Sequence, residues 1–244
     1  MIHIMNDSAK EPKPGLRHAS PPLWLMAIVY TALFIGGLYP VTVFAGQPYF
    51  PGPWESADTI AAFFRTRAAA VRVCAFLQFG AAIPLGIFAA SIASRLAFLG
   101  SRVAGVSIAL FGGIATSATM MAASIALWVM AQPEIASSRD AVQVLYWIVQ
   151  GLGGVGFSVP FGILVAGATI PAAFVRLIPK WLVWFGMVIA VCGELSWLHL
   201  MVPAALPLVP LTRFPGFVWI IAMSLTMPSS FERRTPAAES GAQR

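Results

Sequence analysis

Charged residues are scarce in this sequence, and their scarcity excludes an ordinary soluble domain. Asp, Glu, Lys and Arg make up 10% of the 244 residues, whereas about a quarter is usual in soluble proteins. A soluble fold of this length needs a polar surface, which so few charges cannot provide. Because 59% of the residues are hydrophobic, the composition predicts a chain that is surrounded mostly by lipid.

Cysteine and histidine are also scarce, with two and three residues respectively. Cys74 and Cys192 both lie in apolar stretches, which argues against a disulfide framework and against a Cys/His metal cluster. No acidic pair at helical spacing lies in its apolar runs, and the sequence has no H-E-x-x-H, G-x-S-x-G or P-loop motif. It therefore identifies no catalytic residue, no metal site and no cofactor, and it leaves an enzymatic role open.

The net charge of +6 does not indicate a nucleic-acid partner. Nucleic-acid-binding proteins gather Lys and Arg on one exposed face, whereas here the positive residues lie between apolar runs. Such positions are typical of topology signals and of contacts with anionic lipid headgroups. The lipid bilayer is therefore the partner that the sequence predicts.

Six apolar runs meet or approach the length of about 20 residues that crosses roughly 30 Å of hydrocarbon. They lie at residues 23–44, 68–93, 103–130, 141–170, 181–202 and 214–227. Backbone amides in lipid must pair within their own segment, and the runs lack the alternation of barrel strands, so helices are expected. The predicted fold is an all-α, polytopic bundle of about six transmembrane helices over 23–228, between polar segments at 1–22 and 229–244.

The positive residues are distributed unevenly between the two sides of such a bundle. With the N-terminus inside, the inner segments hold Lys10, Lys13, Arg17, Arg95, Arg102, Arg176, Lys180, Arg233, Arg234 and Arg244. The outer segments hold Arg65, Arg67, Arg72, Arg139 and Arg213. By the positive-inside rule, this asymmetry favours a cytoplasmic location for both termini.

Two outer segments have a composition of their own. Residues 56–67 predict a short interfacial helix, with Ser56 as its N-cap and with Phe63 and Phe64 dipping into lipid. Residues 205–210 are rich in proline and predict a loop before the last span.

Two of the predicted spans share the pattern G-x-x-x-P-x-G-I, at residues 80–87 and 156–163. The match is either an internal repeat, an architecture known in transporters, or a chance similarity between Gly-rich apolar segments. In both cases Pro84 and Pro160 are expected to bend their helices, because each removes one backbone hydrogen bond.

Residues 151–156 fit the pattern G-x-G-x-x-G of dinucleotide-binding loops. They lack the preceding strand and the later acidic residue that such a site needs. We therefore interpret these glycines as a surface for close packing of helices, which glycine permits in lipid.

Polar residues inside the spans are candidates for a site, because they are costly in hydrocarbon and usually have partners or a function. Glu194 is the only acidic residue well inside a span, and Arg72 lies at a similar depth on its own span, which predicts an ion pair. Gln143, Tyr146 and Gln150 share one helix face by their spacing. The predicted outer-half pocket consists of Arg72, Gln78, Gln143, Tyr146, Gln150, Glu194 and His199. The alternative is a structural hydrogen-bond network between helices.

The segment Arg176-Leu177-Ile178-Pro179-Lys180-Trp181-Leu182, with Gly186 after it, is similar to the inner loop and fifth span of a family of bacterial membrane proteins. That family is named only as domain of unknown function 4386. The spacing of the other spans, the extended segment after the first span and the Pro-Gly-Phe-Val-Trp sequence at 215–219 fit it too. The resemblance covers about residues 23–227. It implies a six-span fold in a bacterial inner membrane, and it implies no activity.

These features favour a binder or carrier of a small amphiphilic molecule, held in the outer-half pocket by Arg72 and Glu194. One alternative is a membrane-embedded enzyme or redox subunit for a quinone or haem, with Glu194 or His199 handling protons. Another is a non-catalytic accessory subunit, whose helix faces pack on a partner subunit or on a second copy of the chain.

Overall fold

The computed structural model describes residues 18–230, and every regular element in this range is helical. The polar segments predicted at 1–22 and 229–244 lie mostly outside these residues. The α-helices are α1 (Leu23–Leu38), α2 (Ala57–Thr66), α3 (Ala68–Phe98), α4 (Gly105–Met130), α5 (Pro133–Ala136), α6 (Arg139–Gln150), α7 (Gly156–Phe174), α8 (Lys180–Leu195) and α9 (Leu208–Thr226). A π-helical segment, η3 (Gly151–Val155), joins α6 to α7. Short 3-10 helices are η1 (Tyr39–Val41), η2 (Val43–Ala45), η4 (Ser196–Leu200) and η5 (Pro203–Ala205).

Six of these stretches are long and apolar enough to cross a membrane, which confirms the six-span fold. They are Leu23–Val41, Ala68–Phe98, Gly105–Met130, Arg139–Phe174, Lys180–Leu200 and Pro203–Thr226. The prediction for the last span was wrong at its start, because α9 begins at Leu208 and includes part of the proline-rich segment that predicted a loop. Pro210 falls in the first turn of α9, where a backbone N–H has no partner within the helix, so proline is tolerated there.

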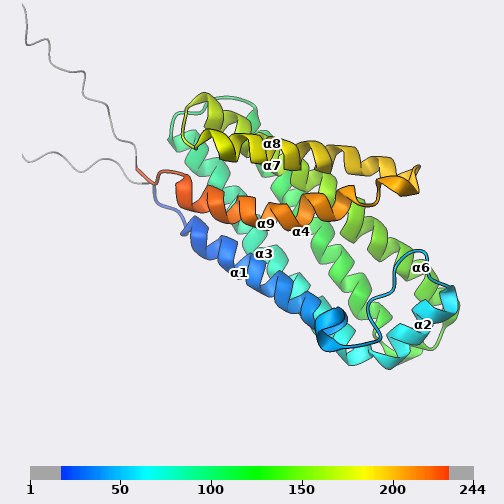
Figure 1. Ribbon diagram of the computed structural model, residues 1–244. Helices are drawn as coiled ribbons and strands as arrows, with labels where there is room; N and C mark the ends of the chain where they lie inside the picture. Colours follow the sequence, from blue (N-terminus) through cyan, green and yellow to red (C-terminus); the bar gives the residue numbers. More distant parts are fainter. Residues whose placement is uncertain (1–17, 231–244) are drawn as a thin grey trace, which may run out of the picture.

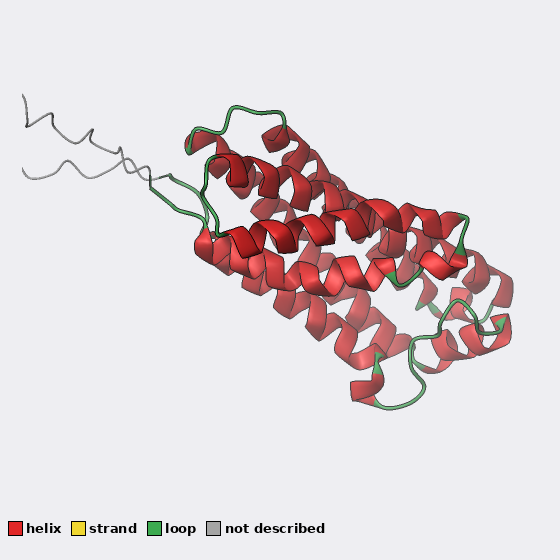
Figure 2. Ribbon diagram, turned by 45° about the horizontal axis from the view of Figure 1, so that its top comes forward, coloured by secondary structure: helices red, strands yellow, loops and turns green. Residues whose placement is uncertain are grey.

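The spanning helices form a closed ring. Each contacts the next in the order α1, α3, α4, α7, α8 and α9, and α9 contacts α1 again. Figure 1 shows α1, α9 and α8 in front of α3, α4 and α7. Both ends of the described chain lie at one end of the bundle (Figures 1 and 2), where the backbone N–H of His18 donates to the carbonyl of Ser229 at 3.0 Å. We call this the terminal end, and the opposite one the α2/α6 end.

Glycines bring the ring helices close together. A Cβ added at Gly193 of α8 would lie 2.8 Å from Cα of Gly162 in α7, and one added at Gly167 of α7 would lie 2.8 Å from Cα of Ala109 in α4. No L-residue larger than glycine fits these contacts without moving a backbone. Glycine therefore sets the distance between α7 and both of its neighbours, as is common between helices in lipid.

The α2/α6 end carries a cap, made of α2, α6 and the segment 46–56. Ser56 accepts a hydrogen bond from the backbone N–H of Thr59, so the predicted short helix and its N-cap are confirmed, and its interfacial location stays a prediction. Its aromatic residues were predicted wrongly, because Phe63 and Phe64 are buried and do not reach lipid. They pack on Phe50 and join a hydrophobic cluster of the cap that is separate from the main core of the bundle.

The cap extends beyond the hydrocarbon layer. The continuous helix Arg139–Phe174 has 36 residues and is therefore about 54 Å long, well above the roughly 30 Å of a bilayer core. Arg139 at its start is exposed and pairs with exposed Asp58 of α2 at 2.7 Å. Because charges of this kind belong in water, α6 is the part of this helix that projects from the membrane.

The two prolines of the repeated pattern lie inside spanning helices. Pro84 is within α3 and Pro160 within α7, and both helices continue past their proline. The glycines two positions later have similar roles: Gly86 faces Ser117 of α4, and Gly162 faces α8. The bends at the two prolines and the internal repeat stay predictions.

Candidate functional site

A cavity of about 910 Å³ lies where the cap meets the bundle, near the upper end of the volume range of ligand pockets. Its walls come from the parts of α1, α3, α4, α6, α7 and α9 nearest the cap, from η1, η3, η4 and η5, and from the segment 46–56. Some lining residues belong to the core of the bundle and others to the hydrophobic cluster of the cap: Phe34, Met120 and Phe157 to the first, and Val41, Cys74, Leu127 and Val149 to the second. The cavity is therefore the seam between two separately packed regions, and most of its lining is apolar.

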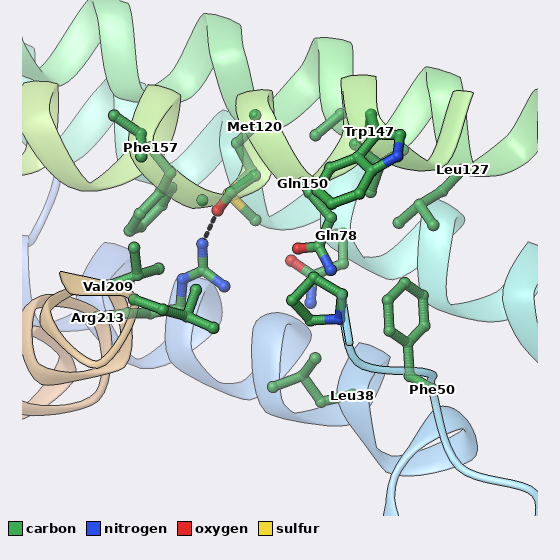
Figure 3. Close-up of a pocket in the computed structure, with 18 of the residues that line it drawn as sticks. Leu38, Phe50, Gln78, Met120, Leu127, Trp147, Gln150, Phe157, Val209 and Arg213 are labelled. Carbon is green, nitrogen blue, oxygen red and sulfur yellow. Dashed lines mark hydrogen bonds between the residues drawn. The ribbon is translucent and has the colours of Figure 1, made fainter. Parts of the chain in front are cut away.

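Within residues 18–230, Arg213 is the only Lys or Arg whose side chain lines this cavity. It lies in the second turn of α9, and its guanidinium is over the ring of Phe157 at 4.6 Å and that of Phe34 at 5.5 Å. One Nη atom donates a hydrogen bond to the carbonyl of Gly153 in η3 (Figure 3). Cation–π contacts and a carbonyl acceptor stabilise a buried guanidinium, but they do not neutralise its charge.

The π-helical segment η3 forms the wall that Arg213 contacts. Its glycines are not used for close packing, so that interpretation of the G-x-G-x-x-G pattern was wrong. A Cβ added at Gly151 or Gly154 would meet nothing within 4 Å, and all three glycines from 151 to 154 line the cavity. The glycines of η3 leave open space in the cavity and leave the carbonyl of Gly153 within reach of Arg213. π-Helical turns are often found at functional sites.

Two amide side chains lie across the cavity from Arg213 (Figure 3). Gln78 of α3 donates to the carbonyl of Phe34 at 3.3 Å, and Gln150 of α6 donates to the hydroxyl of Tyr146 at 2.6 Å. The Tyr146 hydroxyl in turn donates to the carbonyl of Pro51 at 2.8 Å. This chain of hydrogen bonds holds the segment 46–56 against α6, so the polar residues support one wall of the cavity as well as lining it.

The structure brings together some of the residues that were predicted to form the pocket. Gln78, Gln150 and His199 line the cavity. The Nδ1 atom of His199 is buried without a partner among residues 18–230. Tyr146 lies behind the wall and bonds Gln150, as their spacing predicted.

The other three predicted residues lie outside the cavity, and the predicted ion pair is wrong. Arg72 and Glu194 are both exposed, and no ion pair within residues 18–230 joins them. The similar depth of Arg72 and Glu194 in their helices did not make them neighbours, because α4 and α7 separate α3 from α8 in the ring. Gln143 is partly buried and does not reach the cavity.

The residue that sequence reasoning missed is Arg213. It was assigned to an outer loop because the prolines before it concealed the first turns of α9. One signal was present: Arg213 directly precedes the apolar run that predicted the last span. Extending this run back over a first-turn proline places the arginine inside a span, where a charge indicates a site.

Comparison with other proteins gives no assignment: no protein-family model, curated protein or solved structure matches this chain. The site is therefore interpreted from its own residues.

Proposed function

We propose that this protein binds or carries a small amphiphilic molecule in the cavity between cap and bundle. One observation supports this most directly: about 910 Å³ of mostly apolar space, with a few polar groups that include Arg213, the two glutamines and His199. Pockets for small ligands combine an apolar lining with a few placed polar groups in this way. A structural hydrogen-bond network would fill the space between these side chains.

The position of the cavity also fits an amphiphile. The residues of η3 lie where the long helix leaves the hydrocarbon, since α7 alone is 19 residues, or about 28 Å, long. A ligand here has water on the side of the cap and acyl chains on the side of the bundle. In this proposal the terminal end, with Arg95, Arg102, Arg176 and Lys180, faces the cytoplasm of a bacterial cell, as the positive-inside rule and the family resemblance suggest.

Native mass spectrometry of protein extracted from its own membrane tests the proposal. We expect a bound small molecule on the wild type. Gly154→Leu places a side chain in the open space beside η3 and should remove it. Ala118→Leu, on the exposed face of α4, adds apolar surface outside the cavity and should leave the molecule bound.

Other results would contradict the proposal. A molecule retained by Gly154→Leu would bind elsewhere. A haem or quinone lost from Gly154→Leu would favour the redox alternative, with His199 as the nearest imidazole. A stoichiometric protein partner and no small molecule would favour an accessory subunit.

A further inference from the structure

The charges around the cavity do not balance. Among residues 18–230, Arg213 lines it, whereas no Asp or Glu does. Two acidic residues of the spans and the cap are used or placed elsewhere: Glu55 accepts a hydrogen bond from the backbone N–H of Gly52, and Glu194 is exposed on α8. Arg213 is half-buried. Removing a guanidinium even partly from water without a counterion is costly, so the site favours an anion that reaches it.

The guanidinium has donors to spare. An arginine has five N–H donors, and in the described chain Arg213 uses one of its Nη atoms, for the carbonyl of Gly153. Figure 3 shows the other Nη pointing into the cavity, toward the side where Gln78 and Gln150 lie. The rings of Phe34 and Phe157 and the Gly153 carbonyl fix the orientation of the guanidinium plane, which prepares it for a planar or tetrahedral oxyanion.

We propose that the ligand is an anionic amphiphile, with a carboxylate or phosphate headgroup bound by Arg213 and an alkyl chain along the apolar wall. This inference rests on the proposed function and specifies its ligand. The wall beside Arg213 is made of Leu38, Met120, Val209 and Phe214, which offer no hydrogen-bonding side chains to a polar tail. Gln78 and Gln150 each use one amide donor within the protein, and the second N–H of each amide is available to donate to headgroup oxygens.

Binding of three ligands with the same alkyl chain tests this inference. Dodecanoate, dodecyl phosphate and dodecanol are added to the purified full-length protein in neutral maltoside micelles, and their dissociation constants are measured by calorimetry. We expect at least one anion to bind at least tenfold more tightly than dodecanol. The ratio between the two anions shows which headgroup the site prefers.

Variants of the protein test whether Arg213 causes the preference for anions over dodecanol. Arg213→Gln should reduce the ratio of anion to alcohol affinity to within threefold while dodecanol still binds, and Arg213→Lys should keep part of it. Arg72→Gln removes an exposed cation on α3 outside the cavity and should leave the ratio unchanged. If Arg213→Gln does not fold, Gly154→Leu, which keeps the arginine, should lose all three ligands.

Several outcomes would overturn the inference. Equal affinity of the wild type for anions and dodecanol would refute the anionic headgroup and leave the proposed cavity function standing. A preference that survives Arg213→Gln but disappears in Arg72→Gln would place the anion on the surface. Inorganic phosphate that competes as well as dodecyl phosphate would show a site for a free anion, and no binding of any of the three ligands would count against the proposed function itself.

Discussion

Glycine serves opposite purposes in two regions of this bundle. Between α4, α7 and α8 it brings backbones together, and an added methyl group would meet a backbone atom. In η3, at the cavity, an added methyl group at Gly151 or Gly154 would meet nothing. The same residue type in one continuous helix therefore closes the bundle in one place and opens it in another. Glycine content alone does not distinguish a packing surface from a binding surface.

The largest expected effect comes from a methyl group added on the packed side. Gly167→Ala should lower the free energy of unfolding by about 1–3 kcal/mol, because its Cβ meets the backbone of α4 and cannot be accommodated by a side-chain rotation. Thermal denaturation of the detergent-solubilised protein measures the loss. Gly154→Ala is the matched control and should be neutral or stabilising, since alanine favours a helix over glycine by up to about 1 kcal/mol. Equal losses of stability in the two variants would show that glycine has the same role in α7 and in η3.

A smaller effect is expected where the cap meets the cavity. Tyr146→Phe removes the hydroxyl that donates to the carbonyl of Pro51 and accepts from Gln150. It should cost about 0.5–1.5 kcal/mol, the usual net contribution of a hydrogen bond to stability. Hydrogen exchange in the segment 46–56 should rise more than exchange in α7. Tyr39→Phe, whose ring is exposed, is the control, and unchanged exchange in Tyr146→Phe would show that these hydrogen bonds do not hold the segment.

The cap also has an ion pair at its surface, between Arg139 and Asp58. Asp58→Asn should cost less than about 1 kcal/mol, because exposed pairs are weakened by water and salt. The difference from the wild type in thermal denaturation should shrink as salt is raised. Asp140→Asn, at 4.0 Å from the same arginine, should have less effect still. A loss that is large and independent of salt would mean that the cap depends on this pair.

The smallest effect is expected at the terminal end. His18 lies against Phe98 and within 3.0 Å of the Ser94 hydroxyl, and partial burial together with the nearby charge of Arg95 lowers its pKa. The folded protein therefore takes up this proton less readily than the unfolded chain. Stability should fall slightly as pH drops below about 6.5, the ordinary pKa of histidine. His18→Gln should reduce this pH dependence, measured as the change in Tm between pH 8 and 5.5, and an identical dependence in both proteins would contradict the assignment.

The sequence was sufficient for the six spans, because each depends on the composition of one continuous segment. It was also sufficient for Ser56 as an N-cap and for Tyr146 and Gln150 on one helix face, since both follow from local spacing. The predicted Arg72–Glu194 pair failed because depth along a helix says nothing about the order of helices around the ring. Arg213 was missed because the last span was predicted to begin about two turns too late, which placed Arg213 in a loop. A cavity formed by residues from segments far apart in the sequence depends on both kinds of information.

The five residues of η3 have a geometric consequence for the whole helix from Arg139 to Phe174. A π-helical turn contains one residue more than an α-helical turn, and each residue of an α-helix rotates the side-chain direction by about 100°. Residues up to Gln150 and residues from Gly156 onward are therefore out of phase by roughly that angle. One helix can in this way bury Val142, Tyr146 and Val149 of α6 against α2 and α4 and, past η3, direct an unrelated apolar stripe toward α4 and α8. No single periodicity describes its sequence.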